Sequence, residues 1–61
     1  MNAVDNAIDH ICEALDLSTH EVVVYETRVV YAASCELSGR EFYAEGLTPM
    51  DAADALIAAT E

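Results

Sequence analysis

The sequence predicts an α+β domain in which a helix, a three-stranded antiparallel meander and a second helix follow one another. Residues 3–16 carry apolar side chains every three or four positions, as one face of a helix does. Residues 21–45 are rich in β-branched and aromatic side chains, as strands are. Residues 46–51 combine Gly, Thr and Pro in an order that starts a helix. Because the strands are short and lack a crossover, we expect a meander with both helices on one sheet face.

The first predicted helix covers residues 3–16 and has one apolar stripe. The stripe consists of Val4, Ala7, Ile8, Ile11, Cys12 and Leu15. The polar segment DLSTH, residues 16–20, interrupts this spacing. We therefore expect the chain to leave the helix there and to enter the first strand.

Three strands are predicted over residues 21–26, 29–37 and 41–45. Gly39 is expected to take positive φ in the turn between the second and third strands. Side chains alternate between the two faces of a strand, so one set should point toward the helices. That set is Val22, Val24, Phe42 and Ala44, whereas Glu21, Val23, Tyr25, Glu41, Tyr43 and Glu45 should lie on the other face, with Tyr31 a further candidate.

The second predicted helix begins at Pro49. Thr48 is placed to cap it, Asp51 follows three residues later, and Gly46 ends the preceding strand. Its apolar side is expected to contain Leu47, Met50, Ala53, Leu56 and Ile57, with Asp51, Asp54 and Glu61 outside. Residues 1–61 therefore form one domain in this interpretation.

Motifs for catalysis, cofactors and metals do not occur in the sequence. Cys12 and Cys35 belong to no Cys-x-x-Cys pair, and with His10 and His20 they match no zinc-site spacing. Cys12 falls on the apolar stripe, where a free thiol behaves as a small hydrophobic group. A chain this short also leaves little room for an enclosed pocket. We expect a protein that is not an enzyme and that holds neither a metal nor a cofactor.

The charge balance is strongly acidic. Twelve Asp and Glu residues face two Arg and no Lys, for a formal net charge of −10. This charge opposes direct binding to nucleic acid or to an anionic membrane, so we expect a basic protein partner. No apolar run approaches the roughly 18 residues of a membrane span, and we expect a cytoplasmic protein. A proteome adapted to high salt offers an alternative origin for the acidity.

Acidic residues follow one another along one side of the first helix. Asp5, Asp9 and Glu13 are spaced by four residues, and each like-charge pair at this spacing costs a few tenths of a kcal/mol. Asp16 lies near the helix end, where the dipole disfavours an anion. Four residues rise about 6 Å, near every second phosphate of a DNA strand at about 3.4 Å per phosphate. The row is therefore predicted to imitate nucleic acid, and charge reversal at Asp9 and Glu13 should abolish partner binding.

Further contacts are expected from the sheet. Glu21, Glu41 and Glu45 should extend the acidic surface, and Tyr25 and Tyr43 should lie on the same uncovered face. Tyrosine is enriched at protein interfaces because it buries an apolar ring while its hydroxyl stays wet. A homodimer could use this face instead, and a sheet face can also be simply solvated.

The segment from Tyr31 onward resembles the hairpin and helix of HicB-type antitoxins, through Gly46, Thr48, Asp51 and Ala52. This resemblance implies neutralisation of a small ribonuclease toxin. A helix before the first strand and the lack of a separate DNA-binding segment depart from that family. In size, acidity and absence of motifs, the whole chain is also similar to small phage-encoded anti-CRISPR proteins, which implies a viral protein in the host cytoplasm.

The sequence therefore predicts a stoichiometric acidic inhibitor that occupies the basic nucleic-acid-binding surface of a protein or complex, as an anti-CRISPR or other anti-defence protein would. One alternative is a HicB-like antitoxin. The other is a small homodimeric structural domain whose acidity reflects a salty cytoplasm.

Overall fold

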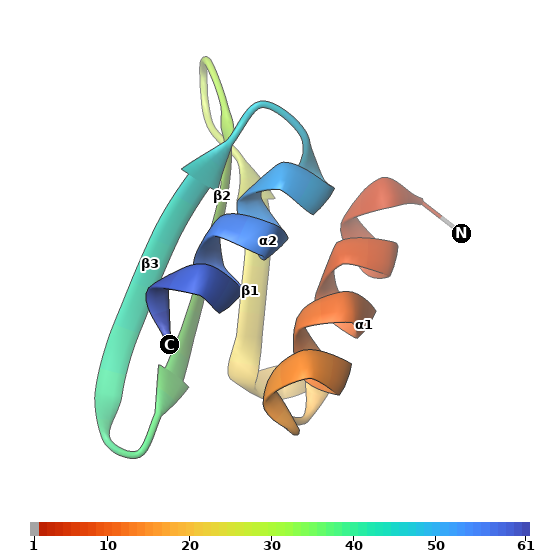
Figure 1. Ribbon diagram of the computed structural model, residues 1–61. Coiled ribbons are helices and arrows are strands. Elements are labelled where there is room, and N and C mark those ends of the chain that lie inside the picture. Colours follow the sequence, from red (N-terminus) through yellow and green to blue (C-terminus); the bar gives the residue numbers. More distant parts are fainter. Residues whose placement is uncertain (1) are drawn as a thin grey trace.

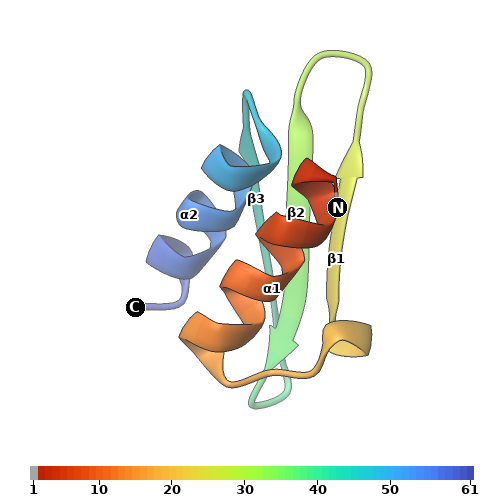
Figure 2. The same ribbon diagram turned by 90° about the vertical axis from the view of Figure 1, so that its right-hand side faces the viewer.

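A computed structural model describes residues 2–61 and confirms the predicted α+β order of helix, meander and helix. The elements are α1 (Ala3–Leu15), the short 3-10 helix η1 (Thr19–Glu21), β1 (Val22–Glu26), β2 (Tyr31–Leu37), β3 (Arg40–Gly46) and α2 (Pro49–Ala59). The strands pair antiparallel in the order β1-β2-β3. Both helices lie side by side against one face of the sheet and leave the other face uncovered (Figures 1 and 2). No helix in this part of the chain is long and apolar enough to cross a membrane.

The core lies between the two helices and the covered face of the sheet. Its buried residues are Ala7 and Ile11 from α1, Val22 and Val24 from β1, Ala33 and Cys35 from β2, and Ala52, Ala53 and Leu56 from α2. Ile11 and Leu56 are the largest fully buried side chains. Because most of the other core side chains are small, the helices can pack closely on the sheet.

The predicted alternation of β1 and β3 is confirmed. Val22 and Val24 are buried and Phe42 and Ala44 pack against the core, whereas Val23 and Tyr43 are exposed. The assignment of Tyr31 to the uncovered face is wrong. Tyr31 pairs with Glu26 on β1 and with Gly46 on β3. Along β2 it lies at alternate positions with Ala33 and Cys35, so its side chain shares their face and packs on the core.

The apolar side of α2 differs from the prediction. Leu47 is 78% exposed and Met50 is 38% exposed, whereas Ala52 is fully buried. The start of α2 lies directly over the end of β3: a Cβ added at Gly46 would lie 2.4 Å from the backbone nitrogen of Ala52. This close approach turns Ala52 toward the sheet and leaves Met50 toward solvent.

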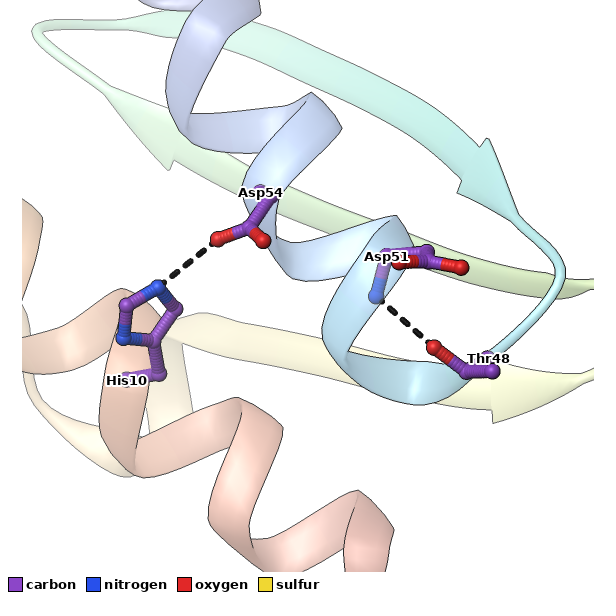
Figure 3. Close-up of polar contacts among 4 residues, drawn as sticks. All are labelled: His10, Thr48, Asp51 and Asp54. Atoms are coloured by element: carbon purple, nitrogen blue, oxygen red, sulfur yellow. Dashed lines mark hydrogen bonds and ion pairs between the residues drawn. The ribbon is translucent and has the colours of Figure 1, made fainter.

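The helix and hairpin ends have identifiable local causes. Thr48 Oγ1 accepts a hydrogen bond from Asp51 N at 3.0 Å, and Pro49 begins α2 as predicted (Figure 3). Ser38 and Gly39 both have positive φ, 54° and 80°, as a two-residue hairpin of type I′ requires.

The first hairpin begins β2 later than predicted. Its loop is closed by Thr27, whose hydroxyl donates to the carbonyl oxygen of Val30 at 2.7 Å and accepts from the Val30 amide at 3.1 Å. Val29 and Val30 therefore belong to the loop and not to the strand, and β2 starts at Tyr31. A threonine takes the place of the Gly or Pro that is more usual in such a turn.

Candidate functional site

Two groups of acidic residues can be distinguished, one on α1 and one on the face of the sheet that the helices leave uncovered. All twelve Asp and Glu residues are exposed. We call Asp5, Asp9 and Glu13 the α1 acidic row. We define the open sheet face as Glu21, Val23, Tyr25, Ala32, Ser34, Glu36, Glu41, Tyr43 and Glu45. The α1 acidic row is exposed on α1, and α1 lies on the side of the sheet opposite the open sheet face (Figure 2). Glu36, Glu41 and Glu45 are thus on the other side of the sheet from α1, whereas Glu21 in η1 is close enough to α1 that its charge, after burial and the charge of Asp9, raises the pKa of the Cys12 thiol.

The α1 acidic row is shorter than expected because α1 ends before Asp16. Asp16 has φ 56° and ψ 49°, and its amide donates to the carbonyl oxygen of Cys12. This left-handed cap directs the chain away from the helix axis. Asp5 lies in the first turn, where its own amide donates to Asn2 Oδ1 at 2.8 Å and where the helix dipole favours an anion. The dipole offsets part of the repulsion between Asp5 and Asp9, so Asp9 and Glu13 are the less favourable of the two like-charge pairs in the row.

Cations neutralise little of this charge. Within residues 2–61 the single close contact between a basic and an acidic side chain is the hydrogen bond that joins His10 Nε2 of α1 and Asp54 Oδ1 of α2 at 2.9 Å (Figure 3). Arg40 lies on the helix side of β3, with its guanidinium 5.5 Å from the centre of the Phe42 ring. Arg28 is exposed in the loop between β1 and β2. Neither arginine pairs with a carboxylate in the described part of the chain.

The open sheet face combines exposed apolar surface with carboxylates. Val23 is 51% exposed, Tyr25 43% and Tyr43 53%. Ala32 is fully buried although it lies on this face, between Tyr25 on β1 and Glu45 on β3. Larger neighbouring side chains therefore cover the centre of the face. The prediction that Tyr25 and Tyr43 share this face with Glu41 and Glu45 is confirmed by the strand register.

The Tyr43 ring is held by a hydrogen bond. Its hydroxyl donates to Glu45 Oε2 at 2.6 Å. This bond to the carboxylate is the main reason why the pKa of Tyr43 is raised to about 12, with the nearby Tyr25 hydroxyl a smaller cause. Glu45 and Tyr43 follow the same strand two residues apart, so the ring is oriented along β3.

A shallow hollow of about 260 Å³ opens at the end of the face where η1 meets β1. It is lined by Glu21, Val23, Ser34, Cys35, Glu36 and Glu41. Glu21 is oriented by accepting a hydrogen bond from the Ser18 amide at 3.0 Å. Glu36 pairs with Glu41 across β2 and β3, so two like charges stand directly opposite one another. Sequence reasoning missed Glu36, although alternation within the second strand places it on the same side as Ser34.

The two cysteines lie outside any cluster of metal-ligating side chains in the described part of the chain. No group of three or more His, Cys, Asp and Glu side chains among residues 2–61 is placed to hold a metal ion. Cys12 and Cys35 are free thiols. Burial raises the pKa of both, and at Cys12 the negative charges of Asp9 and Glu21 raise it further. A raised pKa lowers the thiolate fraction and hence the nucleophilicity.

Comparison with protein-family models, curated proteins and solved structures gives no match to this chain. On the open sheet face, carboxylates and tyrosines are exposed together, and such groups can form salt bridges and stacking contacts with cations.

Proposed function

We propose that this protein is a stoichiometric inhibitor that occupies the basic nucleic-acid-binding surface of a protein partner. The observation that supports the proposal is the exposure of all twelve carboxylates, together with the lack of any arginine–carboxylate pair among residues 2–61. A chain whose acidity served only its own fold would gain by placing cations beside these carboxylates. The negative potential of the exposed carboxylates is therefore not compensated by arginine within residues 2–61 and can attract a cationic partner.

The physical argument for inhibition is competition between polyanions. A groove that binds nucleic acid concentrates Lys and Arg, and a compact acidic domain enters the same field with fast, electrostatically steered association. Occupying the groove blocks nucleic acid without any chemical step. A phage-encoded anti-defence protein, such as an anti-CRISPR protein acting in the host cytoplasm, fits this mode of action.

The test is capture of the partner from the source host with tagged protein, at about 0.1 M and about 1 M salt to vary screening. We expect a nucleic-acid-binding protein or complex that nucleic acid displaces and that high salt releases. Capture of a single small ribonuclease would instead support the antitoxin alternative. Self-association alone, together with a fold that becomes more stable as the salt concentration rises, would contradict the proposal. It would support a homodimeric domain with halophilic acidity.

A further inference from the structure

We propose that the open sheet face is the docking surface, and that its occupant is a basic protein surface presenting arginine side chains. This inference rests on the proposed function for the kind of partner, but it assigns the contact to the sheet and not to the α1 acidic row. It differs from the contact that the sequence predicts, in which the acidic residues of the first helix make the main contacts and the sheet extends them.

The first argument is the distribution of exposed groups. Along the strands, Glu21, Glu36 and Glu41 lie at one end of the face, and Val23 and Tyr43 follow on the two edge strands with Ser34 between them. Tyr25 and Glu45 lie at the other end, on either side of Ala32. Exposed aromatic and aliphatic side chains next to polar groups are typical of protein interfaces. The α1 acidic row has carboxylates without an exposed aromatic or large aliphatic side chain beside them.

The second argument is preorganisation. The hydrogen bond from Tyr43 to Glu45 holds one ring, and the complete burial of Ala32 shows that the side chains above it are packed together. Side chains that are already ordered lose less entropy on binding. The tyrosines therefore contribute contact area at a lower cost in conformational entropy than the carboxylates of the α1 acidic row would.

The third argument is charge complementarity, which selects the occupant. In a symmetric dimer the same patch would meet itself, so the carboxylates of Glu21, Glu36, Glu41 and Glu45 from both copies would be brought into one interface. Neither described arginine lies on the open sheet face to relieve that repulsion, since Arg40 is on the helix side and Arg28 in a loop. A second copy is disfavoured, and a cationic partner is favoured.

Arginine fits this face better than lysine. Its planar guanidinium can stack on a tyrosine ring and donate two parallel hydrogen bonds to a carboxylate. Glu36 and Glu41 stand opposite each other beside Ser34 and Tyr43, so one cation can relieve their mutual repulsion while it contacts the aromatic ring. Lysine offers a point charge without the stacking surface.

The test uses synthetic oligo-arginine and oligo-lysine peptides of equal length, added to the ¹⁵N-labelled full chain and followed by NMR. We expect amide shifts in β1, β2 and β3 around Val23 and Tyr43, and tighter binding of the arginine peptide. The double variant Glu36→Gln/Glu41→Gln should weaken that binding about tenfold, as expected for loss of charge-assisted hydrogen bonds.

The matched control is Asp9→Asn/Glu13→Gln, which removes the same charge from the α1 acidic row. Both double variants relieve a like-charge pair, so both should fold. If only the net charge of the protein mattered, both double variants would weaken peptide binding by the same factor. The docking proposal expects less than about a twofold change in the control. Equal losses, shifts centred on α1, or equal binding of the two peptides would overturn it, as would a dimer by sedimentation that Tyr25→Ala dissociates.

The outcomes for docking and for function are separable. If the natural partner is captured and displaced by nucleic acid, but only the Asp9/Glu13 variant fails to bind it, the docking proposal fails and the proposed function stands. If arginine peptides bind the open sheet face but no nucleic-acid-binding partner is captured, the proposed function fails and the docking surface stands.

Discussion

Glu36 and Glu41 lie directly opposite each other on β2 and β3, on the face of the sheet that neither helix covers. Like charges in this position destabilise a pair of strands. Asp9 and Glu13 create a similar conflict on the other side of the molecule, on α1. Neither arginine pairs with these carboxylates, so both repulsions lower the stability of the isolated fold. A cationic partner would relieve them.

Replacing Glu36 with Gln should stabilise the isolated protein by a few tenths of a kcal/mol, because it removes the opposing charge on Glu41. The gain should shrink as salt screens the repulsion. Urea unfolding at low and high ionic strength measures it. Glu61→Gln changes the net charge equally at an exposed terminal position and should have a smaller effect. Equal gains from both variants would contradict a specific cross-strand repulsion.

Gly46→Ala should destabilise the protein by about 1–3 kcal/mol, because the new Cβ would meet the backbone of α2 at Asp51 and Ala52. Gly39 provides the contrast: its surroundings are open, but its φ of 80° disfavours a side chain. Asn tolerates that conformation better than Ala, so Gly39→Asn should be milder than Gly39→Ala.

At Gly46, by contrast, Asn should be no better than Ala, because the obstacle there is space. Thermal unfolding of the four glycine variants gives the comparison. A milder effect of Asn than of Ala at Gly46 would show that backbone conformation, and not the approach of α2, requires the glycine.

The Tyr43 phenol should titrate near pH 12, above its usual pKa of 10.0, because its hydroxyl donates to the Glu45 carboxylate. The folded state therefore keeps a proton that the unfolded chain loses first. The stabilising effect is complete below about pH 10 and is lost as the pH rises through about 12. The effect on unfolding should be small because the side chain is half exposed.

Glu45→Ala should return the pKa of Tyr43 toward its usual value. The ¹³C NMR signal of the Tyr43 ring, followed through alkaline pH, measures this pKa in the unaltered protein and in Glu45→Ala. An unchanged titration in Glu45→Ala would mean that the hydrogen bond is not the cause of the raised pKa.

Both thiols should react slowly with an alkylating reagent at neutral pH, because burial raises the pKa of Cys12 and of Cys35. Cys12 should react first, since it is only half-buried whereas Cys35 is buried in the sheet. Mass spectrometry of the native protein over time gives the order. Reaction of Cys35 before Cys12 would indicate that the sheet opens more readily than α1 detaches.

The order of elements follows from the sequence because it depends on local patterns. The three- and four-residue spacing from Val4 to Leu15 determines a helix, and alternation in β1 and β3 determines which side chains point inward. Capping by Thr48 and Pro49 is equally local. The placement of Tyr25, Tyr43, Glu41 and Glu45 on one face could therefore be predicted without knowing the fold in detail.

The features that sequence reasoning missed depend on contacts between distant residues. Only the register of β2 against β3 brings Glu36 opposite Glu41, and only the approach of α2 to Gly46 buries Ala52 and exposes Met50. A turn closed by the Thr27 hydroxyl also has a weak sequence signature.

The sequence by itself determined the order of the helices and strands, the cap of α2 and the excess of negative charge, since each is a property of neighbouring residues. Only the tertiary structure decided which carboxylates meet, as Glu36 and Glu41 do across β2 and β3. Both helices lie on one side of the sheet, so α1, which carries the α1 acidic row, is on the side opposite the open sheet face (Figure 2). The physical reason is burial: the apolar stripes of both helices need the same sheet face, so the other face remains open to a partner.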